Sequence, residues 1–252
     1  MTNDRQARAA RAEQMRKERE KADKRQRNLI TVAIVAVVVI LIGAAGWGIK
    51  SMSNSNAKQQ DVVVPKTLSE GDNGGFEFPA TTPAADGAPV VEVYEDFLCP
   101  HCGEFESSTG ALLKQQADAG AIVLRFMPMT IMDGQASEGP AHDVMNAAVC
   151  AAEQEDPAAF WSMHSALFAE KYYEGGGSPS ASELSAVAEE SGVADIESCI
   201  RSGEYVPWLG EAREAAQDRG VTGTPTVFVA DKKIEDVSPA SIQKAIDAAK
   251  KA

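Results

Sequence analysis

Hydrophobic and polar residues alternate around Val91 and Val93, and this spacing predicts a strand that leads into a turn. After the turn the spacing becomes helical, which predicts a helix over residues 100–118 that Gly120 ends. Residues 121–129 are again mostly apolar and predict a second strand. The first part of the pattern is therefore β-α-β.

A block of helices is predicted next, over residues 133–205. Pro140 and Pro157 each stand at the start of a helical pattern, where the missing N–H of proline removes no hydrogen bond. Ser180 with Glu183 three positions later has the spacing of a capping box. These signals predict several short helices in succession.

Strand spacing returns near the C-terminus. Residues 226–229 predict a strand, residues 231–233 a hairpin turn, and the pattern after Ser238-Pro239 a final amphipathic helix. With a short strand at Phe76–Phe78, the order is β-α-β, a helical block, and then β-β-α. This order indicates an α/β (α+β) fold.

Near the N-terminus, residues 29–49 contain 21 consecutive positions without a charge. As a helix they would span about 31 Å, which matches the hydrocarbon core of a bilayer. They therefore predict one transmembrane signal anchor, with a linker at 50–75. The alternative is a cleaved signal peptide, because residues 44–46 are small, although a signal core is usually shorter.

Charge supports this topology. Residues 1–27 carry ten Lys/Arg against five Asp/Glu, a net charge of +5, whereas residues 28–252 carry 14 against 32, a net charge of −18. The basic segment, residues 1–28, is expected to stay in the cytoplasm and the rest to lie outside the cell membrane. The acidic part would repel phosphate, so nucleic-acid binding is not expected.

The chain has four cysteines, and Cys99 and Cys102 stand three positions apart in the stretch DFLCPHCGEFE. Zinc sites usually need four ligands, and no second pair or finger-like histidine spacing accompanies this one, so no metal or other cofactor is predicted. A purely structural disulfide across two residues would close almost no loop. The pair therefore indicates redox chemistry.

The predicted position of Cys99 favours a thiolate. It lies at a helix N-terminus, where unpaired N–H groups and the helix dipole stabilise an anion, and Pro100 is tolerated there. His101 can add a positive charge next to the sulfur. A Cys99 pKa of about 4 would stabilise the reduced form by about 4 kcal/mol at pH 7, which makes the disulfide more oxidising by roughly 90 mV. We expect Cys99 to be the exposed sulfur that substrate attacks and Cys102 its shielded partner.

The strand before Cys99-Pro100-His101-Cys102, together with GVTGTPTVFV at residues 220–229, resembles the thioredoxin superfamily. The motif CPHC matches DsbA-type thiol oxidases, and YEDFLCPHC after an anchor is similar to the extracytoplasmic DsbA-like (MdbA-like) proteins of actinobacteria. The resemblance covers about residues 76–252. It implies a thioredoxin-like domain over 76–132 and 206–252, interrupted by a helical insertion domain at 133–205.

The resemblance also implies that Thr224-Pro225 is a cis peptide packed against the active cysteines, with Thr224 backbone groups free to bind an extended substrate. The alternative is an ordinary trans proline at the start of the strand that follows.

One position departs from the family pattern, which often has a buried carboxylate six residues before the first cysteine. Val93 stands there in this chain. Glu92, Glu95 and Asp96 are close in sequence, but strand alternation does not decide which of them, if any, moves a proton.

The other two cysteines, Cys150 and Cys199, lie within the helical block without CxxC spacing. In an oxidising compartment we expect them to be joined as a structural disulfide, and two free buried cysteines are the alternative. His142 and His164 are interpreted as packing or surface residues rather than catalytic ones.

These features lead to a functional hypothesis: a monomeric oxidase that donates the Cys99–Cys102 disulfide to unfolded, secreted, cysteine-containing proteins. By resemblance, a membrane reoxidase of the DsbB or vitamin K epoxide reductase type would restore the disulfide. The alternatives are an isomerase or reductase, or a non-catalytic metal-binding chaperone that uses the two sulfurs as soft ligands.

Overall fold

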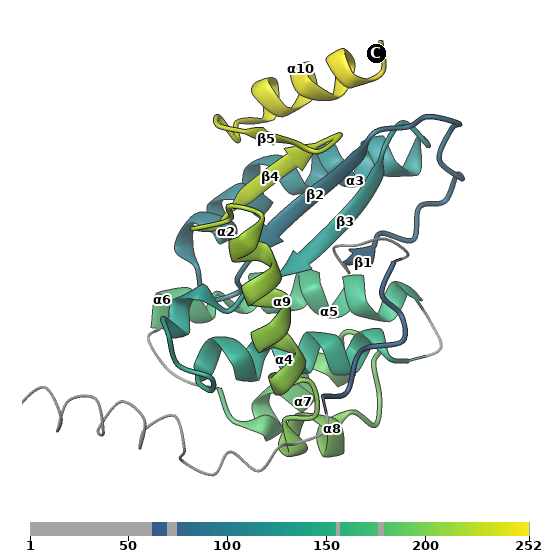
Figure 1. Ribbon diagram of the computed structural model, residues 1–252. Coiled ribbons are helices and arrows are strands. Elements are labelled where there is room, and N and C mark those ends of the chain that lie inside the picture. Colours follow the sequence, from purple (N-terminus) through teal and green to yellow (C-terminus); the bar gives the residue numbers. More distant parts are fainter. Residues whose placement is uncertain (1–61, 70–74, 155–156, 176–178, 252) are drawn as a thin grey trace, which may run out of the picture. The chain divides into compact units, whose positions relative to one another are not determined.

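The structure is a computed structural model that describes residues 62–69, 75–154, 157–175 and 179–251 (Figure 1). The predicted cytoplasmic segment, 1–28, and the predicted anchor, 29–49, lie outside these residues. No helix within the described ranges is both long and apolar enough to cross a bilayer.

A mixed sheet forms the centre of the described region (Figure 1), and its strand order is β1-β3-β2-β4-β5. Strands β2 and β3 are parallel, and the other neighbouring pairs are antiparallel. A parallel pair needs a crossover, which the helical segment between β2 and β3 supplies. The strands are β1 (Phe76–Glu77), β2 (Val90–Glu95), β3 (Val123–Pro128), β4 (Thr226–Val229) and β5 (Lys232–Ile234).

The predicted strands are present, and one predicted turn is displaced. Ala230 and Asp231 form the turn between β4 and β5, with φ of 47° and 61°, and Lys232 already belongs to β5. The predicted turn at 231–233 was therefore placed one residue too late. The reason is that alternation identifies strands well but leaves the ends of short strands open.

The single helix predicted over residues 100–118 is divided into three parts. Helices α2 (Pro100–Phe105) and α3 (Ala111–Asp118) flank a π-helical segment, η1 (Glu106–Gly110). The Glu106 carboxylate lies over Gly110, where a Cβ atom would come within 2.5 Å of Glu106 Oε2. The absence of a side chain at Gly110 thus lets Glu106 pack inward at a π segment, a feature often found at functional sites.

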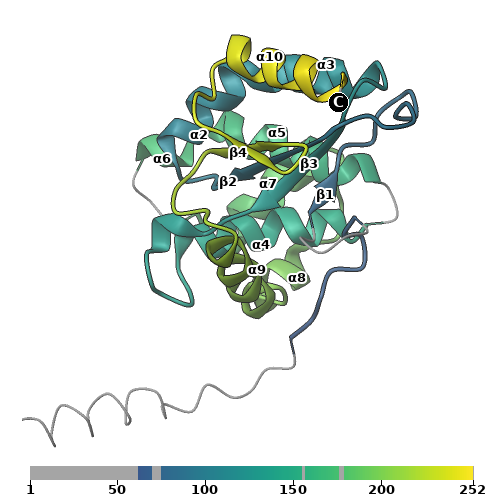
Figure 2. The same cartoon turned by 45° about the horizontal axis from the view of Figure 1, so that its top comes forward.

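Alternate residues of β2 point to opposite faces of the sheet. Val91 and Val93 belong to the main core, which includes residues of α3 and α10, whereas Tyr94 packs with Phe228 in a smaller core on the other face. Figure 2 shows α3 and α10 (Pro239–Ala249) next to each other, and Lys250 Nζ donates to Gln116 Oε1 at 3.3 Å between them. The main core continues into the helical block, so the two parts share one interior.

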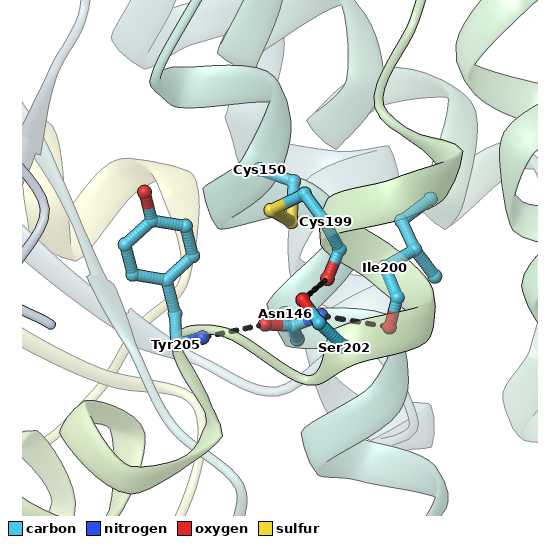
Figure 3. Close-up of a disulfide and its surroundings, with 6 residues drawn as sticks. All are labelled: Asn146, Cys150, Cys199, Ile200, Ser202 and Tyr205. Atoms are coloured by element: carbon cyan, nitrogen blue, oxygen red, sulfur yellow. Dashed lines mark hydrogen bonds between the residues drawn. A yellow bond between two sulfur atoms is a disulfide. The ribbon is translucent and has the colours of Figure 1, made fainter. Parts of the chain in front are cut away.

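The helical block lies in the chain between β3 and α9. It contains a short 3-10 helix, η2 (Ile131–Asp133), and a short α-helix, α6 (Tyr172–Gly175), besides longer helices. The disulfide Cys150–Cys199 joins two of these helices (Figure 3), as expected. The other helices of the block are α4 (Pro140–Ala152), α5 (Pro157–Glu170), α7 (Ala181–Glu190) and α8 (Glu197–Ser202), and α9 (Val206–Asp218) follows them.

Part of the predicted linker at 50–75 lies against the helical block. Pro65 is buried, and the backbone N–H groups of Lys66 and Thr67 donate to Glu153 Oε1 at 2.8 and 3.2 Å. The Thr67 hydroxyl donates to the same oxygen at 3.0 Å. Residues 62–69 are therefore packed onto the end of α4.

Candidate active site

The cysteine pair lies where β2 turns into α2, as the sequence predicts. Cys99 is the N-cap of α2 in an extended conformation, and Pro100 occupies the first helical turn. The carbonyl of Cys99 accepts hydrogen bonds from the N–H groups of Cys102 and Gly103, at 3.0 and 3.2 Å. This places both sulfurs at the N-terminal end of the helix, where backbone N–H groups favour an anion.

The two cysteines are unequal. Both are free thiols and both are buried, with 5% of Cys99 and 0% of Cys102 exposed. The expectation of an openly exposed Cys99 was therefore wrong, because the residue is covered by its surroundings, although it retains more access than Cys102.

Hydrogen bonding holds the pKa of Cys99 far below its usual range, at about 5. The largest contribution comes from the Cys102 thiol, and Thr224 and the N–H groups of Cys102 and His101 add to it against the opposing effect of burial. Burial, followed by the bond to Cys99, strongly raises the pKa of Cys102. One sulfur of the pair is thus poised as a thiolate and the other as a thiol.

The His101 side chain lies beside an acidic residue. Its imidazole Nδ1 lies 3.2 Å from Glu104 Oε2, and both side chains are 77% exposed. The backbone N–H of His101 is among the groups that lower the Cys99 pKa. The sequence did not predict Glu104 as the partner of this side chain.

The loop before β4 lies against Cys99. The Thr224–Pro225 bond is cis, and Cys99 Sγ lies 3.4 Å from the Thr224 carbonyl oxygen. A groove with a volume of about 670 Å³ runs beside this contact, and its lining includes His101, Phe105 and Pro225. The structure therefore places Cys99 against the predicted substrate-binding residue Thr224, and Thr224, Pro225 and His101 line the groove.

The structure separates the three carboxylates that the sequence left undecided. Glu92 lies on the other face of the sheet, where Arg219 Nη1 is 2.7 Å from its Oε2. The two Asp96 carboxylate oxygens accept the N–H groups of Leu98 and Met132 at 2.9 Å, and burial raises the pKa of Asp96 to about 7. Glu95 shares a face with Val93 and is 1% exposed.

His142 and His164 are both fully buried. For His142 this supports the interpretation as a packing residue. Its Nδ1 lies 2.7 Å from Asp133 Oδ2 and its Nε2 3.0 Å from Thr130 Oγ1. This hydroxyl–imidazole–carboxylate row has no access for substrate, because Thr130 is also 0% exposed. It fixes the segment between β3 and α4 beside the active site.

His164 has a different environment that the sequence did not reveal. Its Nε2 lies 3.7 Å from Glu95 Oε2, and Glu106 completes a group whose ligand-type atoms all lie within 4.8 Å of one another. The members come from β2, η1 and α5, so their meeting depends on tertiary packing. The one local signal was a histidine on the otherwise apolar face of α5.

Comparison with known proteins places these features in context. A family model described as thioredoxin matches residues 84–248. No curated protein matches the chain.

Three solved structures are similar to the chain. Oxidised DsbA from Mycobacterium tuberculosis is 29% identical with a TM-score of 0.58, over 69% of this chain and 97% of that one. The reduced disulfide bond oxidoreductase DsbG from the same organism is 31% identical with a TM-score of 0.55, over 64% and 83%. MdbA, a thiol-disulfide oxidoreductase from Corynebacterium diphtheriae, has a TM-score of 0.62 over 76% and 99%, and at 24% identity it supports the fold alone.

Proposed function

The chain belongs to the thioredoxin family and is a thiol-disulfide oxidoreductase, and from this premise we propose that it donates its Cys99–Cys102 disulfide to secreted, still unfolded proteins outside the cell membrane. The observation that carries this proposal is the opposite shift of the two sulfur pKa values, low for Cys99 and high for Cys102. A thiolate stabilised in the reduced form makes the disulfide a better oxidant.

The size of the effect follows from the Cys99 pKa of about 5. At pH 7 the thiolate is favoured by about two pH units, which corresponds to roughly 3 kcal/mol of stabilisation of the reduced form. This makes the pair more oxidising by about 60 mV than an unperturbed dithiol. This change in reduction potential is smaller than the roughly 90 mV expected for a Cys99 pKa of about 4, but it has the same direction.

The transfer takes place in two steps. A substrate thiolate attacks Cys99 Sγ, the Cys99–Cys102 bond breaks, and its electron pair leaves on Cys102 Sγ, which takes up one proton. A second substrate thiolate attacks the substrate sulfur of the mixed disulfide, and Cys99 leaves as a thiolate. The substrate is oxidised to a disulfide, the pair is reduced, and one of the two substrate protons is released to solvent.

The groove beside Pro225 is proposed as the place where substrate lies. Thr224 and Pro225 form one wall next to Cys99, and an extended peptide there can pair with backbone groups of the loop. Main-chain recognition of this kind suits an enzyme that accepts many unfolded sequences.

The proposed location rests on two features. Residues 29–49 are predicted to anchor the chain with its basic N-terminus in the cytoplasm, and the Cys150–Cys199 disulfide fits an oxidising compartment. A membrane reoxidase of the DsbB or vitamin K epoxide reductase type would then restore the active disulfide after each turnover.

The reduction potential should depend on pH in two regimes. Above about pH 5 Cys99 is a thiolate, so reduction takes up one proton and the potential falls by about 30 mV per pH unit; below it, reduction takes up two protons and the slope is about 59 mV. The stabilisation of the reduced form is thus present above pH 5 and is lost as the pH falls through that value. Equilibration with glutathione buffers between pH 4 and 7 measures the slope, and a constant 59 mV would contradict a low Cys99 pKa.

Oxidative refolding tests the proposal itself. The oxidised protein, incubated with a reduced, unfolded enzyme that needs several disulfides, should restore that enzyme's activity in proportion to the oxidase added. If the protein instead restores activity only when the substrate starts with wrongly paired disulfides and a reductant is present, it is an isomerase. Failure to oxidise the substrate, together with metal retained by the two sulfurs after purification, would instead indicate a non-catalytic metal-binding chaperone.

A further inference from the structure

Three polar side chains that the proposed function does not use lie together inside the protein: Glu95, Glu106 and His164. Glu95 ends β2, Glu106 begins η1, and His164 belongs to α5. One ligand-type atom from each of them, a carboxylate oxygen or an imidazole nitrogen, lies within 4.8 Å of the other two. Three separate elements therefore bring two carboxylates and one imidazole to a single point.

His164 is the member of this cluster whose hydrogen bonding is least complete. It is 0% exposed, and neither of its ring nitrogens has a hydrogen-bond partner among the described residues. Five aromatic rings surround the imidazole: Phe97, Phe126, Phe160, Trp161 and Phe168. A buried polar group without a partner costs free energy, so a native protein that keeps one calls for an explanation, such as an ion that binds to it.

The spacing within the cluster is that of metal ligands and not of hydrogen-bonded groups. His164 Nε2 lies 3.7 Å from Glu95 Oε2, which is too long for a hydrogen bond. Two ligand atoms that each lie ~2.1 Å from one zinc ion are roughly 3.4 Å apart at a tetrahedral angle, and further apart at a wider one. Glu95 Oε1 also has no hydrogen-bond partner in the described part of the chain, although Glu95 is 1% exposed. An ion between these side chains would therefore satisfy atoms that they leave unsatisfied among themselves.

The ionisation of the cluster also suits a cation. Burial holds the pKa of His164 well below its usual value, so the imidazole is neutral, and the neutral ring is the form that binds metals. Burial raises the pKa of Glu95 well above its usual range, and the nearby charge of Glu106 raises it further. Two buried carboxylates that disfavour each other's charge are stabilised together by one positive ion between them.

The donor set indicates zinc among the common divalent cations. An imidazole nitrogen suits zinc and other transition metals, and carboxylate oxygens bind zinc at a similar distance. Calcium takes about six to eight oxygen ligands and magnesium keeps several waters, whereas this cluster offers one nitrogen and two carboxylates in a largely buried position. Three protein ligands leave one position of a zinc tetrahedron for water, and the Glu106 side chain, which is 14% exposed, is the side from which water has access.

Lys114 supplies a positive charge next to this cluster. Its Nζ lies 3.5 Å from Glu106 Oε2, so it repels a second cation there. The same ammonium donates to Ser165 Oγ at 3.3 Å, lies 5.7 Å from the centre of the Trp161 ring and belongs to a side chain that is 27% exposed. It can therefore leave Glu106 and keep other partners, which makes it a competitor of a metal ion and not a barrier to one.

We propose that Glu95, Glu106 and His164 form a binding site for one zinc ion. The site shares no ligand with the Cys99–Cys102 pair, and it goes beyond the disulfide exchange proposed above. Glu95 precedes Cys99 by four residues and Glu106 follows Cys102 by four, so the ion joins both ends of the active-site segment to α5 of the helical block. Its role is to stabilise the folded protein, because it binds when the three elements are packed together.

The first experiment titrates zinc chloride into the full-length chain that carries Cys99→Ser and Cys102→Ser, after a chelator has removed bound metal. Both active sulfurs are absent from this chain, so any binding comes from other groups. One zinc ion per chain should bind tightly enough to be retained on desalting, and the midpoint of thermal unfolding should rise with the zinc concentration. If zinc does not bind to this chain, the proposal is wrong.

Single substitutions in this background identify the ligands. Glu95→Gln and His164→Gln should each weaken zinc binding by about a hundredfold or more, because each removes one of three ligands. Glu92→Gln and His142→Gln are the matched controls, since each removes the same kind of buried group outside the cluster, and they should change the affinity less than about threefold. Equal losses in the ligand and control variants would contradict a site at this cluster.

Lys114→Gln gives a result that a loss of folding cannot imitate. The substitution keeps a polar side chain but removes the competing ammonium beside Glu106, so zinc should bind about tenfold more tightly. An unchanged or weaker affinity would mean that the ion does not bind next to Glu106, and the proposed ligand set would then be wrong.

Cobalt(II) reports the chemical type of the ligands in the wild-type protein. Oxidised wild type should bind cobalt in place of zinc and give a visible spectrum without the intense sulfur-to-cobalt band of thiolate sites. Such a band in reduced wild type, with no metal bound by the Cys99→Ser/Cys102→Ser chain, would assign the metal to the two sulfurs and overturn the proposal. Oxidative refolding by metal-free wild type tests the proposed function separately, so either proposal can fail without the other.

Discussion

Replacement of Cys99 by serine should reduce disulfide transfer to the uncatalysed level, a loss of roughly three orders of magnitude or more. A serine hydroxyl is not ionised at neutral pH and cannot form the mixed disulfide, whereas the Cys99 thiol has a pKa of about 5. The loss is measured as the second-order rate constant with a reduced peptide that contains one cysteine.

Cys102→Ser is the matched control, because it also removes the active disulfide but keeps the sulfur with the low pKa at position 99. The raised pKa and complete burial of Cys102 make it the leaving and resolving sulfur. Its serine variant should therefore react with a substrate disulfide at Cys99 and remain as a stable mixed disulfide, detectable as a mass increase. The opposite pattern, with adducts on Cys102 in Cys99→Ser, would reverse the roles assigned to the two sulfurs.

The parts of the site that the sequence predicted are those fixed by local structure. The junction of strand and helix at Cys99-Pro100 follows from a change of hydrophobic spacing and from the tolerance of proline in the first turn of a helix. The cis bond at Thr224–Pro225 came from the resemblance and not from the residues, because proline alone leaves the trans form more common.

The parts that the sequence missed depend on side-chain packing between distant segments. Strand alternation places Glu95 and Val93 on one face, but only the observed end of β2 shows that Glu95 is covered while Glu92 meets Arg219. The π segment arises because Gly110 accepts the inward Glu106 side chain, a contact without a periodic signal. His164 lies on the apolar face of α5, where a histidine usually indicates packing, and its approach to Glu95 requires the helical block to be in place.

The disulfide Cys150–Cys199 should be the largest single contribution to stability among the features described. It closes a loop with a sequence separation of 49 residues, for which the chain-entropy model gives about 4 kcal/mol. The Cys150→Ala/Cys199→Ala variant should therefore lose about that much free energy of unfolding in a urea titration. Disulfide transfer should change less than about twofold, because the pair lies in α4 and α8 and contributes no group to the active site.

A second experiment breaks the Cys150–Cys199 bond without replacing either cysteine. In a Cys99→Ser/Cys102→Ser background the structural disulfide is the one bond that a reductant can break, so the same chain can be unfolded with and without it. Asn146 remains after reduction, with its side chain bonded to the Ile200 carbonyl at 3.4 Å and the Tyr205 N–H at 2.9 Å (Figure 3), so α4 and α8 should stay joined in the folded state. The lost stability would then come from the unfolded chain, which gains freedom when the loop opens. A loss below about 1 kcal/mol would mean that the unfolded chain already keeps these two helices together.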